Sequence, residues 1–256
     1  MSAFFAFLKK ECLAHLRSGK LFILLGVFAL FGIMNPGIAK LTPWMLEEMS
    51  ETLAQSGMNI TATESTVLDS WVQFFKNIPM ALIVFVILES RIFTAEYRSG
   101  TLVLSLTKGL DRYKVVVAKT LTLVLLWTAL FWLCAGITYG CNELFWDNQD
   151  ARHLLLSIGC WWVFGVWVLM LTVLFSVLFP SNIGVLGCTA GVVLVSYLLS
   201  LLPKLQDWLP TFLMNGNPLI YGVAKPEDYA VALGITGGLT VLFFLVSIPV
   251  FNKKQL

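Results

Sequence analysis

The sequence predicts an all-α membrane protein with six transmembrane helices, and three observations favour this fold class. Apolar residues make up 58% of the 256-residue chain and charged residues only 12%, and the mean hydropathy of +0.82 lies far above that of soluble domains. The apolar runs are continuous rather than alternating, which favours helices over a barrel. Because about 20 apolar residues cross a bilayer core of about 30 Å, the chain is long enough for six spans in a single domain over residues 1–256.

The first element, residues 1–20, is expected to form an amphipathic helix that lies flat on the membrane surface. Its apolar residues fall on one side at helical spacing, and its basic residues fall elsewhere. The apolar side carries Phe5, Leu8, Cys12 and Leu16. A cleaved signal peptide is the weaker alternative, because no small-residue cleavage site follows the first apolar run.

Six apolar segments follow and are expected to span the membrane. They lie at residues 21–39, 78–95, 115–140, 154–179, 183–202 and 230–251. The largest connection, 40–77, is predicted to be an outer loop containing a short acidic helix. It is interpreted either as a solvated cap over the helix ends or as a gate at the outer exit.

The distribution of Lys and Arg sets the expected orientation. Twelve of the seventeen basic residues fall on one side of the six-span arrangement, together with both termini. The excess of basic residues on the cytoplasmic side of membrane proteins therefore predicts cytoplasmic termini. Acidic residues show the opposite bias, and membrane topology thus explains the basic residues without a nucleic-acid partner.

Catalytic and metal-binding patterns are scarce in the sequence. No Gly-x-x-x-x-Gly-Lys-[Ser/Thr] run is present, so no phosphate loop for ATP is expected in this chain. The five cysteines contain no Cys-x-x-Cys pair, and the two histidines, His15 and His153, are expected at opposite membrane faces. We expect no metal site, no cofactor and no enzymatic activity within the chain itself.

Ionisable residues are also scarce inside the predicted spans. Glu89 and Arg91 lie near the inner end of the second span, and almost no charge lies at mid-membrane. Secondary transporters bind their coupling ion near the midplane. The sequence therefore favours an energy source outside this chain.

The connector at residues 97–113 carries charges and glycines between two apolar spans. Gly100 lets the backbone turn away from the preceding helix, and Thr101 suits the first position of a new short helix. The remaining residues supply an apolar docking face and a charged rim. The apolar face holds Leu102, Val103 and Leu106, and the rim holds Arg98, Lys108 and Arg112.

This connector resembles the cytoplasmic signature of ABC-2 type transporter permeases. In that family a Glu near the end of the second span precedes a Gly-Thr-Leu that opens a coupling helix, and an Arg and a Lys follow. The matching residues are Glu96, Gly100, Thr101, Leu102, Arg112 and Lys119. The Pro that often follows the short helix is replaced here by the run Thr107 to Arg112, in which Gly109 supplies the turn.

The resemblance extends over the whole chain in outline, including a re-entrant stretch around Asn217-Pro218-Leu219 before the last span. The chain looks most like small bacterial permeases of peptide and antimicrobial-peptide export or immunity systems, such as the phenol-soluble-modulin exporter. The resemblance implies a homodimer, or a dimer with a related paralogue. It also implies two copies of a separate cytoplasmic ATPase that bind ATP and Mg²⁺, and export of a hydrophobic or amphipathic peptide, drug or lipid across the bacterial cytoplasmic membrane.

The resemblance also implies roles for particular residues. Contact with the ATPase is expected from Glu96, Arg98, Gly100, Thr101, Leu102, Val103, Leu106 and Arg112. The bend between the second span and the connector, which we call the elbow, is expected to be held by charged residues. These are Glu89, Arg91 and Lys119, with Glu96 paired to Arg98 or Lys119. Four tryptophans are interpreted either as lining of the substrate path or as lipid-facing residues: Trp127, Trp132, Trp161 and Trp162.

Two further interpretations remain open. The chain is also consistent with a membrane anchor or sensor subunit that docks an ATPase without forming a path, and with an ion-coupled carrier.

Pairs of glycines at small-xxx-small spacing, including Gly187/Gly191 and Gly234/Gly238, favour packing within the chain over a dimer interface.

Overall fold

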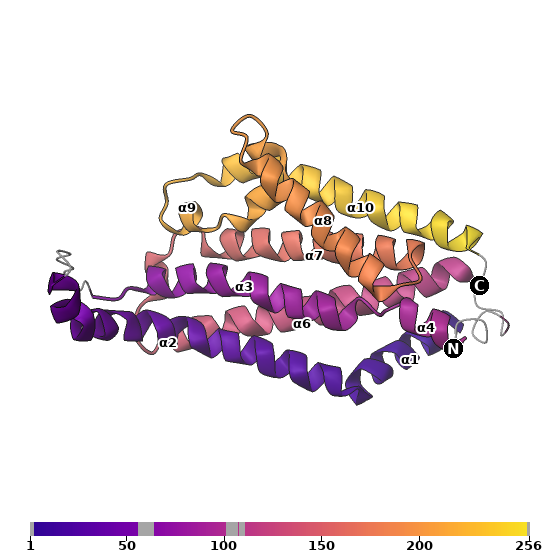
Figure 1. Ribbon diagram of the computed structural model, residues 1–256, viewed down its shortest axis with the longest axis horizontal. Helices are drawn as coiled ribbons and strands as arrows, with labels where there is room; N and C mark the ends of the chain where they lie inside the picture. Colours follow the sequence, from indigo (N-terminus) through magenta and orange to yellow (C-terminus); the bar gives the residue numbers. More distant parts are fainter. Residues whose placement is uncertain (1–2, 56–63, 101–106, 108–110, 255–256) are drawn as a thin grey trace.

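The computed structural model describes residues 3–55, 64–100, 107 and 111–254, and its helices lie side by side in an elongated bundle (Figure 1). The helices are α1 Ala3–Arg17, α2 Gly19–Gln55, α3 Val67–Glu89, α4 Thr94–Ser99, α6 Arg112–Asn142, α7 Leu154–Leu178, α8 Asn182–Ser200, α9 Asn217–Ile220 and α10 Ala230–Lys253. Short 3₁₀ turns are η1 Asn148–Asp150, η2 Gln206–Trp208, η3 Pro210–Met214 and η4 Pro226–Tyr229. No strand occurs in these described ranges, which confirms the all-α fold class.

Six of the described helical segments are long and apolar enough to cross a membrane. They correspond in order to the six predicted spans, so the chain is a multi-pass membrane protein. The two termini and α4 lie at one end of the bundle, which we call the terminal end, while η1 and α9 lie at the opposite end, the loop end (Figure 1).

Helix α1 precedes the first span and turns at Ser18 into α2 (Figure 1). The sequence predicted an amphipathic helix over residues 1–20, and the helical part ends at Arg17. Phe7 and Glu11 face the bundle and are buried, whereas Phe5 and Leu16 are exposed. The apolar side identified from the sequence is thus divided: Phe5 and Leu16 face outward, where a lipid surface would cover them, whereas Leu8 is half-buried and packs against the core.

Helix α2 is longer than the predicted first span. The sequence placed its end at residue 39 and an outer loop at 40–77, yet the helix continues to Gln55 and α3 begins at Val67. Much of the predicted loop is therefore helix. Asp69 caps the start of α3, because its carboxylate accepts hydrogen bonds from both the backbone N–H and the hydroxyl of Thr66.

Two prolines, Pro36 and Pro43, lie inside α2, and the predicted first span ended between them at residue 39. A proline lacks an N–H, so Pro36 leaves the carbonyl of Gly32 without its helical donor. The hydroxyl of Thr138 in α6 supplies a hydrogen bond to that carbonyl at 3.0 Å. Asn35 donates to Thr138 and accepts from Asn77 of α3. This buried polar chain joins the three helices where the proline interrupts the backbone ladder.

The core of the bundle is rich in aromatic rings. Trp127 of α6 is fully buried and packs edge-on against Phe28 of α2 and Phe85 of α3. Gly165 of α7 makes room for this ring, because a Cβ atom there would overlap the Trp127 indole. The close approach of α6 and α7 therefore depends on a glycine at this position.

At the loop end, the segment between α8 and α10 folds back onto α7. Trp161 donates to the carbonyl of Met214 at 2.8 Å, and Ser157 donates to the carbonyl of Gly216 at 2.9 Å. Leu213 and Leu219 are fully buried. This packing matches the re-entrant stretch that the sequence suggested before the last span.

Candidate functional site

Helix α3 gives way to the short helix α4 at the terminal end. After α3 ends at Glu89, a turn buries Phe93, and α4 runs from Thr94 to Ser99. Gly100 then ends α4 in the left-handed conformation, with φ at 65°. Glycine adopts this conformation without steric cost, so Gly100 provides the turn that the sequence analysis assigned to it.

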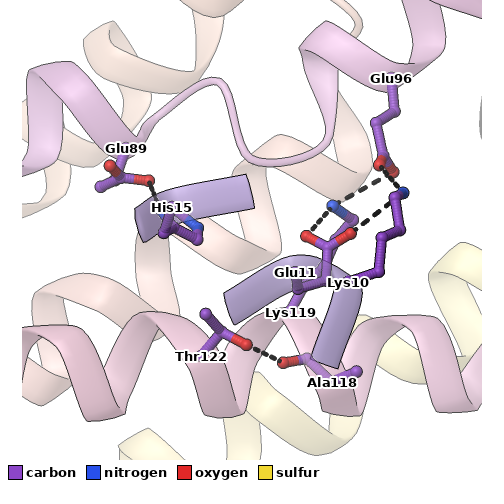
Figure 2. A network of polar contacts seen from close by, with 8 residues as sticks. All are labelled: Lys10, Glu11, His15, Glu89, Glu96, Ala118, Lys119 and Thr122. Atoms are coloured by element: carbon purple, nitrogen blue, oxygen red, sulfur yellow. Dashed lines mark hydrogen bonds and ion pairs between the residues drawn. The ribbon is translucent and has the colours of Figure 1, made fainter. Parts of the chain in front are cut away.

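Four charged side chains from α1, α4 and α6 meet beside this turn (Figure 2). Lys119 Nζ lies 2.8 Å from Glu11 Oε2 and 3.1 Å from Glu96 Oε2. Lys10 Nζ lies 3.3 Å from Glu11 Oε1 and 3.3 Å from Glu96 Oε1. We call Lys10, Glu11, Glu96 and Lys119 the charge cluster. Two cations and two carboxylates alternate in it, and each cation contacts both carboxylates.

The charge cluster is mostly withdrawn from solvent. The side chain of Lys119 is 3% exposed, that of Glu11 8% and that of Glu96 16%, whereas Lys10 is half exposed and closes the outer side. Buried charges are costly unless they are paired, and removing one partner leaves the others uncompensated. The cluster therefore fixes the relative positions of three helices more firmly than exposed ion pairs would.

The charge state of the cluster follows from these contacts. Burial by itself would raise the pKa of Glu11, but its pairing with Lys119 and Lys10 outweighs burial and holds that pKa below its usual value. Burial would lower the pKa of Lys10, yet Glu96 and Glu11 raise it above its usual value. Both groups are therefore ionised at neutral pH.

A second contact holds the end of α3. The imidazole Nδ1 of His15 lies 3.7 Å from Oε2 of the buried Glu89 (Figure 2). Lys20 of α2 donates to the carbonyl of Leu88 at 2.9 Å. The junction of α1 and α2 is thus attached to the last turn of α3, next to the charge cluster.

The start of α6 is bonded to the end of α10. Arg112 donates from Nη1 to the carbonyls of Asn252, at 3.0 Å, and Lys254, at 2.7 Å. The ammonium of Lys254 donates to the carbonyl of Val177 in α7 and lies 4.2 Å above the ring of Tyr97 in α4. These contacts connect the C-terminal end of the last helix to the connector region.

A family model described as ABC-2 family transporter protein matches residues 5–205. The chain belongs to the ABC-2 transporter family. The matched range includes the charge cluster, α4 and the connector that carried the resemblance in the sequence. No curated protein matches the chain.

The structure brings some of the predicted coupling residues of this ABC-2 protein together and separates others. Glu96 pairs with Lys119, one of the two partners expected from the sequence. Arg112 contacts the C-terminal backbone, and Arg91, expected to supply structural charge, is exposed and lines a small pocket. Arg98 lies in α4. Four predicted residues lie outside the described ranges: Thr101, Leu102, Val103 and Leu106.

Sequence reasoning missed Lys10 and Glu11 as members of the site. Both had been placed on a helix at the membrane surface, without a partner. One signal was available: Glu11 is the only acidic residue in the first 46 positions of this ABC-2 chain, and it follows the apolar residues Phe7 and Leu8. Because Glu11 lies four residues after Phe7, the two share a face of the helix, and a carboxylate that is buried on such a face is almost always paired.

Of the four tryptophans interpreted as path lining or as lipid-facing residues, two are in contact, because the indole N–H of Trp127 donates to the carbonyl of Trp162 at 3.4 Å. Trp127 lies in the core, and Trp162 donates to the hydroxyl of Thr128 at 3.0 Å. Trp132 is 39% exposed on the outside of the bundle. Only Trp161 lines the large groove between α3, α7 and α8 of the ABC-2 protein, among the cavities found in the described residues.

Proposed function

We propose that this ABC-2 protein is the permease subunit of an ATP-driven exporter in the bacterial cytoplasmic membrane. The terminal end faces the cytoplasm, where two copies of a separate ATPase bind the connector. A second permease copy completes the path, through which a hydrophobic or amphipathic substrate leaves the cell. A peptide substrate is the narrower form of this proposal.

The charge cluster is the observation that carries the proposal. Helix α4 leads directly into the connector, and Glu96 attaches α4 to Lys119 of α6 and to Lys10 of α1. A force applied to the connector therefore acts on the first and third spans as well as on α3. This arrangement suits a subunit whose helices are moved from outside the membrane.

The proposed energy source is ATP hydrolysis by a separate subunit, and the sequence supports it. The full sequence contains no phosphate loop, so ATP hydrolysis requires another chain. The basic residues near the connector, together with the basic excess of the terminal end, favour the cytoplasmic orientation. An ATPase that binds there has access to cytoplasmic ATP.

Affinity purification in mild detergent, followed by mass spectrometry, tests the partnership. We expect a phosphate-loop ATPase to accompany the wild-type chain and to be lost from the Thr101→Arg/Leu102→Arg variant. The control is Leu144→Arg, which places a single arginine on a highly exposed position beyond the end of α6, at the loop end. An ATPase that stays bound to the connector variant would refute docking at the connector.

Reconstitution of the purified complex tests transport itself. We expect ATP hydrolysis to rise when a transported substrate is added, and substrate to accumulate on the other side of the vesicle only with ATP. Hydrolysis without accumulation would favour the anchor or sensor interpretation. Accumulation driven by an ion gradient without ATP would favour an ion-coupled carrier.

A further inference from the structure

A large groove lies between α3, α7 and α8 and has a volume of about 870 Å³. Its lining is almost wholly apolar: Ile83 and Ile87 come from α3, Phe164 from α7, and Gly191 and Leu194 from α8. None of its lining residues is charged. Such a surface is covered by apolar groups in a membrane.

A smaller pocket of about 230 Å³ lies at the terminal end, between the region that follows α3 and the start of α8. It is lined by Arg91, Thr94, Ala95 and Asn182. Asn182 precedes Leu186, a groove residue of the same helix α8, by four, and Arg91 lies in the turn that follows the end of α3 at Glu89. Residues four apart lie on the same face of a helix. Along α8, the polar pocket therefore continues the apolar groove by one helical turn.

The polar pocket is suited to an anion. The side chain of Arg91 is exposed and forms no ion pair or hydrogen bond with the described part of the chain, while the nearby carboxylates of Glu89 and Glu96 are directed to His15 and to the charge cluster. Asn182 lies in the first turn of α8, where backbone N–H groups are free and the helix dipole is positive.

The side-chain amide of Asn182 gives an independent indication. Its oxygen is shielded from solvent and has no hydrogen-bond partner among the described residues. Because the amide can turn to present either its oxygen or its NH₂ group, it can donate to a phosphate in the pocket. Asn182 as a whole is half-buried, but its shielded oxygen is left without a partner, which is unusual in native structures and consistent with a ligand at this point.

The groove has the depth of a single leaflet. Its lining runs from Pro79 to Ile87 in α3 and from Leu186 to Tyr197 in α8. At 1.5 Å per residue these stretches are ~12 and ~16 Å long, about half of a bilayer core of ~30 Å. An occupant with its charge at Arg91 would place its apolar part in one leaflet only.

We propose that this groove binds an anionic phospholipid from the leaflet at the terminal end, with its phosphate at Arg91 and Asn182 and an acyl chain between α3 and α8. That leaflet is the cytoplasmic one in the proposed orientation. Binding at this site does not depend on the ATPase, so it can be tested separately from the proposed transport.

Native mass spectrometry of the full chain in detergent tests the site. Phosphatidylglycerol and phosphatidylcholine with identical acyl chains are added in turn. We expect the wild type to retain phosphatidylglycerol and the Arg91→Gln variant to retain it about tenfold less, as the loss of a charged hydrogen bond predicts. Arg17→Gln is the matched control, because Arg17 is an exposed arginine at the same end. Equal losses in both variants would overturn the proposal.

A second variant tests the groove without disturbing the fold. A Cβ atom at Gly191 meets nothing within 4 Å, so Gly191→Leu fills the groove rather than straining the helix. Gly238→Leu in α10 is the matched control, since its surroundings are equally open. We expect only Gly191→Leu to lose phosphatidylglycerol. Unchanged lipid retention combined with a loss of dimer would refute the proposal and assign the groove to a second copy of the chain.

Discussion

Lys119 Nζ lies 2.8 Å from Glu11 Oε2, and both side chains are almost completely buried, although 108 residues separate them in the chain. This pair joins the helix before the first span to the third span. Because Glu96 contacts the same ammonium, any movement of α4 changes the environment of a buried charge.

Removing Lys119 is expected to destabilise the protein strongly. In the Lys119→Met variant, Glu11 and Glu96 lose their buried partner, and we expect a loss of about 3 kcal/mol in the free energy of unfolding. Thermal unfolding in detergent measures it. The double variant Glu11→Gln/Lys119→Met should lose less than the sum of the two single variants. Additive losses would show that the pair is not coupled.

The cluster also predicts a pH dependence of stability. The folded state lowers the pKa of Glu11 below its usual value of 4.5, so the unfolded chain takes up the proton first as pH falls. The stabilisation is present above 4.5 and is lost as pH falls through the lower folded-state pKa. Melting temperatures of wild type and Glu11→Gln should therefore converge in acid. A constant difference between them down to the lowest pH would contradict this assignment.

Arg112 is expected to hold the last turn of α10 in place. In Arg112→Gln, the carbonyls of Asn252 and Lys254 lose their donor, and amide exchange around residues 250–253 should accelerate at least severalfold. The control is Lys114→Gln, which removes an exposed pair with Asp111. If exchange stays slow while ATPase binding falls, Arg112 acts on the partner instead.

Gly100 is expected to matter through its backbone conformation. A Cβ atom there meets nothing within 4 Å, but φ is +65°, a conformation that costs a β-branched residue roughly 1–2 kcal/mol. Gly100→Val should therefore reduce stimulation of the partner ATPase, and Gly100→Asn should retain most of it, since asparagine tolerates this conformation. Equal activity in the two variants would exclude a role for the turn.

The contact between Gly165 and Trp127 predicts a large difference between two glycines of α7. Gly165→Ala would overlap the Trp127 ring, and overpacking of this kind costs about 1–3 kcal/mol. Gly159→Ala meets nothing within 4 Å and should be neutral or slightly stabilising, because alanine favours helix. Thermal unfolding of both variants provides the comparison, and similar melting temperatures would contradict the close packing of α6 against α7.

The apolar segments allowed the six helices and their order to be predicted, because spanning a bilayer imposes length and composition together. The extent of α2 was not predictable in the same way. The predicted span ran through Pro36 and ended at residue 39, and the hydrogen bond that this proline removes is replaced by Thr138, about a hundred residues away. Long-range contacts of this kind leave no pattern near the proline itself.

The residues of the candidate site were likewise predicted only in part from the sequence. Glu96, Gly100 and Lys119 were predicted because their spacing resembles a family pattern, and the structure brings Glu96 and Lys119 together. Lys10 and Glu11 were missed because the burial of one face of α1 depends on α6 and α4. Trp127 was interpreted from its residue type as either path lining or a lipid-facing residue, and the structure places it in the core.

The position of Glu11 has a consequence for biosynthesis. The N-terminal part of the chain is made first, so Glu11 leaves the ribosome 108 residues before its partner Lys119. Until α6 enters the membrane, this carboxylate has no buried cation to neutralise it, and α1 remains at the water interface. The helix can reach its final position only after the third span has been inserted, so α1, although synthesised first, is among the later elements of the protein's N-terminal half to dock.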